Sequence, residues 1–236
     1  TGYGLVYLTE KMLESLDTSF NGKTTSISGS GNVAIYAAEK AMQLGAKVIA
    51  MSDSNGYVYD KDGINIETIK VIKEQQRGRI CEYLKYHKNA QYFENGLIWS
   101  VPCHVALPCA TQNEITEQGA KILVENGCIA VAEGSNMSTN IEAIELLQKN
   151  NVLFAPGKAS NAGGVAVSAL EMAQNSARLY WSFNDVDEKL QDIMHSIYTS
   201  ISETAEAYGM KGNLVAGANI AGFKKVAQAM LFQGVV

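Results

Sequence analysis

The 236-residue sequence lacks a long apolar run, a cluster of basic residues and a paired-cysteine motif. No apolar stretch approaches the roughly 20 residues that a membrane-spanning helix needs. The net charge of −5 combines residues of both signs that are spread along the chain. We therefore expect neither a membrane nor a nucleic acid as a partner.

The four cysteines, Cys81, Cys103, Cys109 and Cys128, form no CxxC pair. Cys103-His104 and Cys109 are close in sequence, but their spacing matches no zinc motif. Cysteines without a disulfide or zinc pattern are typical of reduced thiols. The sequence thus predicts no metal site and a cytoplasmic location.

What the sequence does contain is an alternation of short apolar strands with helices. Strand patterns occupy residues 23–28, 47–51, 90–94, 104–108, 128–133 and 151–155. Helical patterns occupy residues 1–16, 32–44, 65–76, 78–88, 116–125, 140–149, 160–181, 186–208 and 216–232. Hairpin signals occur at Asn55-Gly56 and Asp62-Gly63. The alternation predicts an α/β protein, with a Rossmann-type, doubly wound, mostly parallel sheet, helices on both faces and a C-terminal helical segment.

The stretch SISGSGNVAIYA, residues 26–37, places two glycines between a strand and a helix. A phosphate-binding loop needs this arrangement, because Gly29 can make a tight turn and Gly31 lets the backbone approach a pyrophosphate. Ala34 stands where the third small residue of that motif belongs, and Asp53 follows the next strand near the spacing of a ribose-binding acid. This context favours dinucleotide binding over the alternative, a purely structural turn.

Polar motifs also follow three later strands. The stretches LPCATQNE (107–114) and AEGSNM (132–137) lie where open parallel sheets bind ligands, although any strand-to-helix loop is polar. The stretch PGKASNAGGVAVSALEM (156–172) places Asn161, Val165 and Ser168 on one helical face. That face could line a pocket, and the alternative is close helix packing at Gly163 and Gly164.

Seven stretches stand out as a set: TGYG, SGSGNVA, SDSNG, LPCATQNE, EGSNM, LFAPGKASNAGGVAVSALEMAQN and GANIAGFKKVA. In this order, over residues 1–236, the chain resembles the hexameric bacterial glutamate dehydrogenases. The resemblance implies reversible oxidative deamination of L-glutamate to 2-oxoglutarate and ammonia with a nicotinamide cofactor. It also implies a full-length homohexamer, whose subunit contacts lie mostly outside this stretch.

The resemblance assigns roles to individual residues. Those that would hold the pyrophosphate are Gly29, Ser30, Gly31, Asn32 and Val33. Those that would lie near the nicotinamide end are Thr1, Gln112, Asn136 and Asn161, with Thr1 bonded to the carboxamide. Val165 and Ser168 would touch the glutamate side chain, and Ser168 would donate to its γ-carboxylate. These roles favour function over packing for the helical face in residues 156–172.

Hydride transfer to an amino or keto acid requires an acid–base group, and the sequence offers no convincing one. Lys158 is expected to be a loop cation, and His87, His104 and His195 show no recognisable spacing to a carboxylate. The resemblance explains this absence, because the family's catalytic lysine and aspartate belong to a preceding substrate-binding domain. We therefore expect no catalytic residue in this chain and no activity from the chain alone.

The chain opens inside a helical pattern, which is typical of a piece of a longer protein. We expect residues 1–20 to be an entry helix from a missing substrate domain. Residues 21–185 would form the dinucleotide-binding domain, and residues 186–236 the C-terminal helices.

Two other functions remain open. The substrate could be a branched or aromatic amino acid, but such a side chain would leave the Ser168 hydroxyl without an ionic partner. A non-catalytic dinucleotide-sensing module is favoured only by the missing acid–base groups.

The choice of coenzyme rests on two opposed arguments. Asp53 favours NAD(H), because its carboxylate can accept from the ribose 2′-hydroxyl and repel a 2′-phosphate. The stretch SDSNG is more similar to NADP-dependent bacterial enzymes, in which Ser52, Asp53 and Ser54 would surround the phosphate. The cations that could offset the charge of Asp53 are Lys70, Lys73 and Arg77. We expect NADP(H) as the preferred cofactor, with NAD(H) also used.

Overall fold

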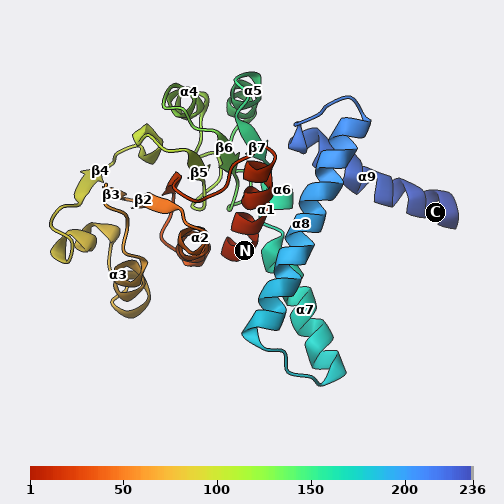
Figure 1. The fold of residues 1–236 in the computed structure, drawn as a ribbon, viewed down its shortest axis with the longest axis horizontal. Helices are drawn as coiled ribbons and strands as arrows, with labels where there is room; N and C mark the ends of the chain where they lie inside the picture. Colours follow the sequence, from red (N-terminus) through yellow and green to blue (C-terminus); the bar gives the residue numbers. More distant parts are fainter. Residues whose placement is uncertain (235–236) are drawn as a thin grey trace.

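The computed structural model describes residues 1–234, which are built around one seven-stranded sheet (Figure 1). The strands are β1 Thr24–Ile27, β2 Lys47–Asp53, β3 Gly56–Tyr59, β4 Gln91–Glu94, β5 Val105–Leu107, β6 Ala130–Ala132 and β7 Leu153–Ala155. Their order is β4-β3-β2-β1-β5-β6-β7, in which β3 and β4 join one edge antiparallel and the other strands are parallel. The predicted Rossmann-type, mostly parallel sheet is confirmed.

Helices cover both faces of the sheet, as predicted (Figure 1). The α-helices described, including those of the C-terminal arm, are α1 Gly2–Glu14, α2 Asn32–Gln43, α3 Ile66–Lys70, α4 Glu117–Glu125, α5 Ile141–Lys149, α6 Gly157–Ser160, α7 Gly163–Ala177, α8 Phe183–Ala207 and α9 Leu214–Gln233. Side chains alternate between the two faces along a strand. In β5, Val105 and Leu107 join the core formed with α1 and α2, whereas Ala106 joins the core formed with α4 and α5.

Helix α1 lies in the centre of the molecule, between α2 and the C-terminal helices (Figure 1). The inward-facing side chains that its pattern predicted are fully buried: Leu5, Leu8, Met12 and Leu13. Leu16 lies beyond the helix end and is 42% exposed, so the predicted apolar face is one residue too long. Gly4 packs against Gly163 of α7 so closely that a Cβ on Gly4 would come within 2.7 Å of the Gly163 Cα.

Two predicted helices are interrupted where the backbone turns. The helix expected over 65–76 continues from α3 into a π-helical turn, Val71–Gln75, and ends before Arg77, whose φ of 52° is left-handed. The next segment is a 3₁₀ helix, Ile80–Lys85, rather than the expected α-helix over 78–88. The helix expected over 160–181 is shorter: α6 ends at Ser160, and α7 runs only from Gly163, where the close contact with Gly4 lies, to Ala177.

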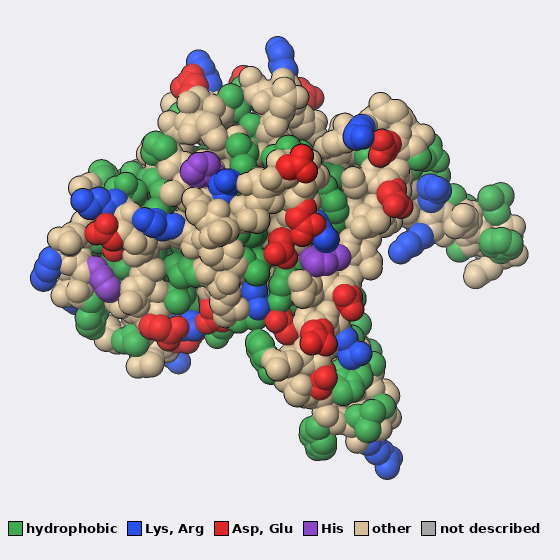
Figure 2. Space-filling view, in the orientation of Figure 1, with side chains coloured by type: hydrophobic (Ala, Val, Ile, Leu, Met, Phe, Trp, Pro, Cys, Tyr) green, Lys and Arg blue, Asp and Glu red, His purple; other side chains and the backbone are tan. Residues whose placement is uncertain are grey.

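The C-terminal helices form an arm on one side of the sheet. Helix α8 packs against α1, α7 and α9, while the outer turns of α9 extend away from the body (Figures 1 and 2). None of the helices within residues 1–234 is long and apolar enough to cross a membrane. Helix α8 begins at Phe183, three residues before the boundary expected at 186. The division into 1–20, 21–185 and 186–236 stays a prediction.

Candidate functional site

The chain reverses its course across the sheet between β1 and β5. From β1 it continues outward through β2, β3 and β4, and β5 then starts on the other side of β1. Open α/β sheets bind ligands beyond the carboxyl ends of the strands at such a point. A cleft of about 770 Å³ lies there. The predicted site residues that line it are Thr1, Val33, Gln112, Asn136, Asn161 and Val165.

Glycine stands at the two positions after β1, 29 and 31, for different structural reasons. Gly29 has a φ of 85°, and a Cβ on it would come 3.0 Å from the carbonyl oxygen of Cys109. Gly31 has an ordinary extended φ of −88°, and a Cβ there would meet no atom of the described residues within 4 Å. Gly29 is therefore required by the turn, whereas the space above Gly31 is open to a ligand.

The N-terminus of α2 opens onto this turn. Gly31 is its N-cap residue, and none of the described side chains caps the helix. The first backbone N–H groups of a helix carry partial positive charge and favour an anion. The turn and the start of α2, which comprise the predicted residues from Gly29 to Val33, therefore form a cradle suited to a phosphate.

Thr1 reaches the cleft because α1 and α7 approach very closely. A Cβ on Gly164 would overlap the Thr1 hydroxyl, and one on Gly163 would come 2.9 Å from the Gly4 Cα. The packing interpretation of this glycine pair is thus correct, and it coexists with the pocket. The close approach places Thr1 beside Asn161 and Val165 in the wall of one cleft.

The loops after β6 and β7 meet at the same cleft. The Asn161 Nδ2 donates to the Asn136 Oδ1 at 2.7 Å. Val165 is 71% exposed and lines the cleft, whereas Ser168 is exposed one helical turn further along α7 and is not among the lining residues. The predicted face of α7 is therefore accessible, and only its first part borders the cleft.

Asp53, at the end of β2, holds two backbone segments together. One carboxylate oxygen accepts from the Asn55 N–H and the other from the Ile80 N–H, both at 2.9 Å. The Ser52 hydroxyl accepts from the Gly29 N–H at 2.9 Å and so fixes the glycine turn. Hydrogen bonds to both carboxylate oxygens disperse the negative charge of Asp53 and reduce its repulsion of a nearby phosphate.

A cation that the sequence interpretation missed contacts this region. The Arg79 Nη1 donates to the Ser54 Oγ at 2.8 Å. Arg79 immediately precedes the 3₁₀ helix whose Ile80 N–H is bonded to Asp53.

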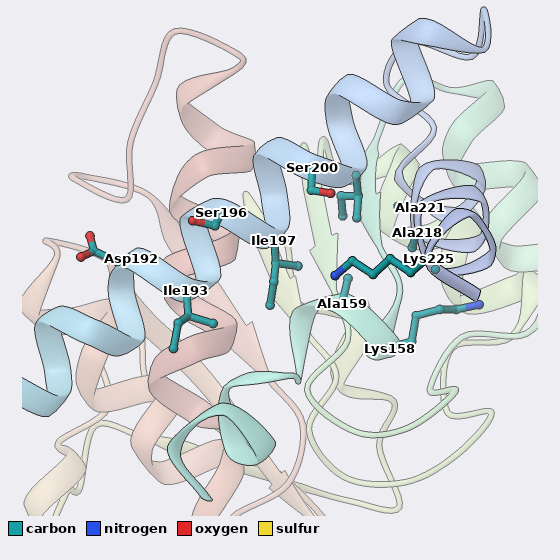
Figure 3. Close-up of a pocket in the computed structure, with 12 residues that line it drawn as sticks. Lys158, Ala159, Asp192, Ile193, Ser196, Ile197, Ser200, Ala218, Ala221 and Lys225 are labelled. Carbon is teal, nitrogen blue, oxygen red and sulfur yellow. The ribbon is translucent and has the colours of Figure 1, made fainter. Parts of the chain in front are cut away.

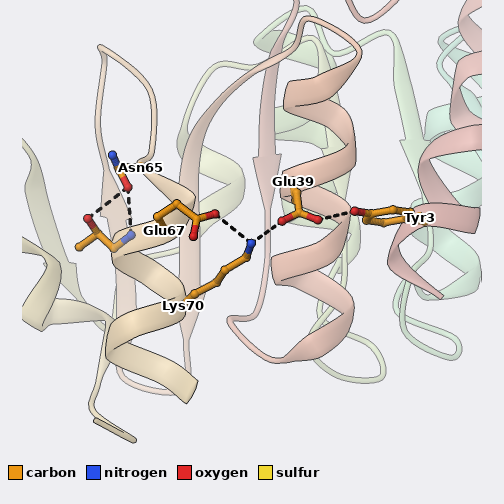
Figure 4. Close-up of polar contacts among 6 residues, drawn as sticks. Tyr3, Glu39, Asn65, Glu67 and Lys70 are labelled. Atoms are coloured by element: carbon orange, nitrogen blue, oxygen red, sulfur yellow. Dashed lines mark hydrogen bonds and ion pairs between the residues drawn. The ribbon is translucent and has the colours of Figure 1, made fainter. Parts of the chain in front are cut away.

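Of the three cations that could offset the charge of Asp53, two are bonded to other groups. Lys70 forms ion pairs with Glu39 of α2 and Glu67 of α3 (Figure 4). The hydrogen bond to Glu39 raises the pKa of Lys70 above its usual value. The Lys73 Nζ donates to the Gly78 carbonyl oxygen at 2.9 Å, and Arg77 lies in the left-handed turn.

Glu39 also ties α1 into this region. It accepts from the Tyr3 hydroxyl as well as from Lys70, so that α1, α2 and α3 are linked through one carboxylate (Figure 4). Burial, together with the bond to Glu39, raises the pKa of Tyr3 to about 12. Because Tyr3 is two residues from Thr1, this link helps to hold the N-terminal end of α1 at the cleft.

The side chains that line the cleft include none suited to acid–base catalysis near neutral pH. Among the described residues that line it, the one titratable side chain is Cys109, and burial raises the pKa of that thiol well above its usual value. Within residues 1–234 no group of histidine, cysteine and acidic residues could hold a metal. The side chains of the cleft can therefore bind and orient a ligand.

A second hollow, of about 720 Å³, lies between α6, α8 and α9 (Figure 3). Its walls include Ile193 and Ile197, with Lys158 and Lys225 among the polar residues. The Lys158 Nζ donates to the Asn219 Oδ1 at 2.5 Å, and Lys158 lies in α6 and not in a loop as expected. None of the predicted site residues lines this hollow, so the cleft beyond the carboxyl ends of β1 and β5 is the candidate site.

A glycine turn leading into a helix, at the switch point of a mostly parallel sheet, defines the class of dinucleotide-binding Rossmann domains. The comparisons agree with this class. The family model for Glutamate/Leucine/Phenylalanine/Valine dehydrogenase matches residues 1–234. The chain belongs to this family.

Relatives of the chain are glutamate dehydrogenases. The NADP-specific enzyme of Helicobacter pylori is 53% identical over 242 residues, which cover 100% of this chain and 54% of that protein. The NAD(P)-specific enzyme of Xylanibacter ruminicola is 50% identical, with 100% and 53% covered. The crystal structure of Plasmodium falciparum glutamate dehydrogenase matches with a TM-score of 0.96 at 48% identity, covering 100% of this chain and 51% of that one. The chain spans about half the length of these relatives.

Proposed function

We propose that the chain is the cofactor-binding part of a glutamate dehydrogenase, which converts L-glutamate reversibly to 2-oxoglutarate and ammonia. The observation that carries the proposal is the cleft at the switch point, with an open cradle above Gly31 and a polar wall formed by Asn136 and Asn161. This cleft fits a nicotinamide dinucleotide, whose ring would exchange a hydride with the substrate. The catalytic lysine and aspartate would belong to the other half of the longer protein.

Titration calorimetry of the purified chain with NADP⁺ tests the proposal directly. We expect saturable binding of one dinucleotide per chain, because the cradle and the cleft both lie within residues 1–234. An absence of heat at millimolar NADP⁺ and NAD⁺ would overturn the proposed function.

The proposal includes a homohexameric full-length protein in the cytoplasm. All four cysteines carry free thiols, which supports a reducing compartment. The hexamer is supported by the resemblance, and light scattering of the full-length protein tests it.

For the coenzyme, we propose a preference for NADP(H) with appreciable use of NAD(H). The Arg79 guanidinium donates to the Ser54 hydroxyl just after β2, where a ribose 2′-phosphate would lie and could accept from its remaining N–H groups. A hydrogen bond to a charged group contributes about 1.5–3 kcal/mol. Arg79→Ala should therefore weaken NADP⁺ binding about tenfold to hundredfold and change NAD⁺ binding little.

The matched control is Lys85→Ala, which removes an exposed cation paired with Glu82 from the same segment. It should leave both affinities unchanged. In the full-length enzyme, comparing kcat/KM for both cofactors before and after Asp53→Ser tests the opposing argument. A native preference for NAD(H) above about tenfold, reversed by that substitution, would show that Asp53 determines the choice by simple repulsion.

For the substrate, we propose that Ser168 bonds the γ-carboxylate of glutamate. Ser168→Ala in the full-length protein should lower kcat/KM for glutamate about tenfold to hundredfold, chiefly through KM, and leave the KM for the cofactor unchanged. Steady-state kinetics measures both constants. The control Ser176→Ala, an exposed serine later on α7, should be neutral. Equal changes in both KM values would assign Ser168 a packing role.

A further inference from the structure

Glu133 is a buried carboxylate next to the cleft for which the sequence interpretation gave no role. It directly follows β6 and is 3% exposed. Burying an ionisable side chain is costly unless its polar atoms are bonded. Burial raises the pKa of Glu133, in opposition to the hydrogen bonds that the carboxylate accepts. A residue with this cost needs a structural reason.

Glu133 joins two loops through both its side chain and its backbone. Its carboxylate accepts from the Thr139 N–H and from the Gly157 N–H, each at 2.7 Å. Its backbone carbonyl accepts from the Ser160 hydroxyl at 2.6 Å, and its backbone N–H donates to the Ala155 carbonyl at 3.1 Å. The loop after β6 is thereby fastened to the end of β7 and to both ends of α6.

The two fastened segments each present an asparagine to the cleft. Asn136 lies in the loop between Glu133 and Thr139, and Asn161 is the residue that caps the C-terminal end of α6. The two side chains are bonded to each other at 2.7 Å. The distance between the two asparagines depends on the spacing of the two loops. Among the described residues, no other carboxylate joins these loops.

We propose that Glu133 is a positioning residue, which sets Asn136 and Asn161 at the spacing that the nicotinamide half of the cofactor requires. The inference rests on the proposed function. The cradle at Gly31 and the Ser54–Arg79 pair lie on other loops and are not held by Glu133. The contribution of Glu133 is thus confined to one half of the cofactor.

The side chain must be a carboxylate of this length. It faces two N–H donors, and each oxygen accepts from one of them. The amide of Gln offers one acceptor oxygen, and its NH₂ group would face the second N–H donor. An Asp side chain is one methylene shorter and cannot keep both contacts from the same backbone position.

The test measures two ligands on the purified chain by titration calorimetry. Glu133→Gln should weaken binding of NADP⁺ about tenfold to hundredfold. Binding of adenosine 2′,5′-bisphosphate, which lacks the nicotinamide half, should stay within about twofold. The control Glu145→Gln replaces an exposed carboxylate on α5 and should change neither affinity.

The outcomes separate the inference from the proposed function. Unchanged NADP⁺ affinity in Glu133→Gln, or an equal loss for both ligands, would overturn the positioning role and leave the proposed function intact. If the unsubstituted chain binds neither ligand, the proposed function is wrong and the inference falls with it.

A second variant keeps the test informative if Glu133→Gln does not fold. In Gly157→Ala the added Cβ would come 3.0 Å from the Ser135 carbonyl oxygen and 3.2 Å from the Glu133 Oε2. Alanine favours the helix more than glycine does, so the substitution separates the two loops without weakening α6. It should show the same selective loss of NADP⁺ affinity, and normal binding of both ligands would overturn the proposal.

Discussion

The Gly31→Val variant is expected to keep its fold and to lose measurable dinucleotide binding. The space where a Cβ would stand is free of described protein atoms, so the valine side chain would project into the place of the pyrophosphate. Its effect on stability should be about 1 kcal/mol, because valine is a poorer N-cap residue than glycine. Affinity should fall by more than about a hundredfold, or roughly 2.8 kcal/mol. Circular dichroism and titration calorimetry measure the two effects.

Gly222→Val is the matched control, because a Cβ at this α9 position also meets no atom within 4 Å. It should leave dinucleotide binding unchanged. Gly29→Val provides the contrast, since its φ of 85° and the nearby Cys109 carbonyl make a side chain there damaging to the fold itself. A folded Gly31→Val protein with unchanged affinity would refute the assignment of the cradle.

The second large effect concerns turnover. The purified chain should bind cofactor yet oxidise glutamate several orders of magnitude more slowly than the full-length protein. The reason is that the described side chains lining the cleft include none that exchanges protons readily near neutral pH. Removing catalytic groups from an enzyme typically costs about 10⁴ to 10⁶ in rate. Absorbance at 340 nm, with equal molar amounts of both proteins, measures the difference.

Full-length protein from the same host is the positive control for this assay. A rate from the chain alone that approaches the full-length rate would show that its own residues carry the catalysis. A full-length protein that binds NADP⁺ but turns over no amino acid would instead support a dinucleotide-sensing module.

The sequence predicted six of the seven strands because they are short apolar runs, and it missed β3, for which only the hairpin signal at Asn55-Gly56 was noted. Strands such as β5 and β6 are buried on both faces, so their composition alone marks them. The α3 region was less predictable. Its apolar spacing continues past Lys70, but the left-handed turn at Arg77 and the fit against Asp53 set the actual helix type.

The sequence could predict which residues follow the strand ends and so reach the cleft. It could not predict the direction in which individual side chains point. The rule for parallel strands, together with the resemblance, brought Gln112, Asn136 and Asn161 to one cleft. No pattern could show that Lys70 turns to Glu39 while Arg79 turns to Ser54. Glu133 was overlooked because it follows an apolar strand, although a carboxylate directly after a buried run is itself a signal.

The contact of α1 with α7 limits which substitutions this chain can tolerate during evolution. Gly4 and Gly163 face each other without side chains, and Gly164 makes room for Thr1. A side chain at Gly4 or Gly163 would push the two helices apart and so displace Thr1, although neither of these two glycines lines the cleft. Natural selection for cofactor binding must therefore also act on positions that the cofactor never contacts.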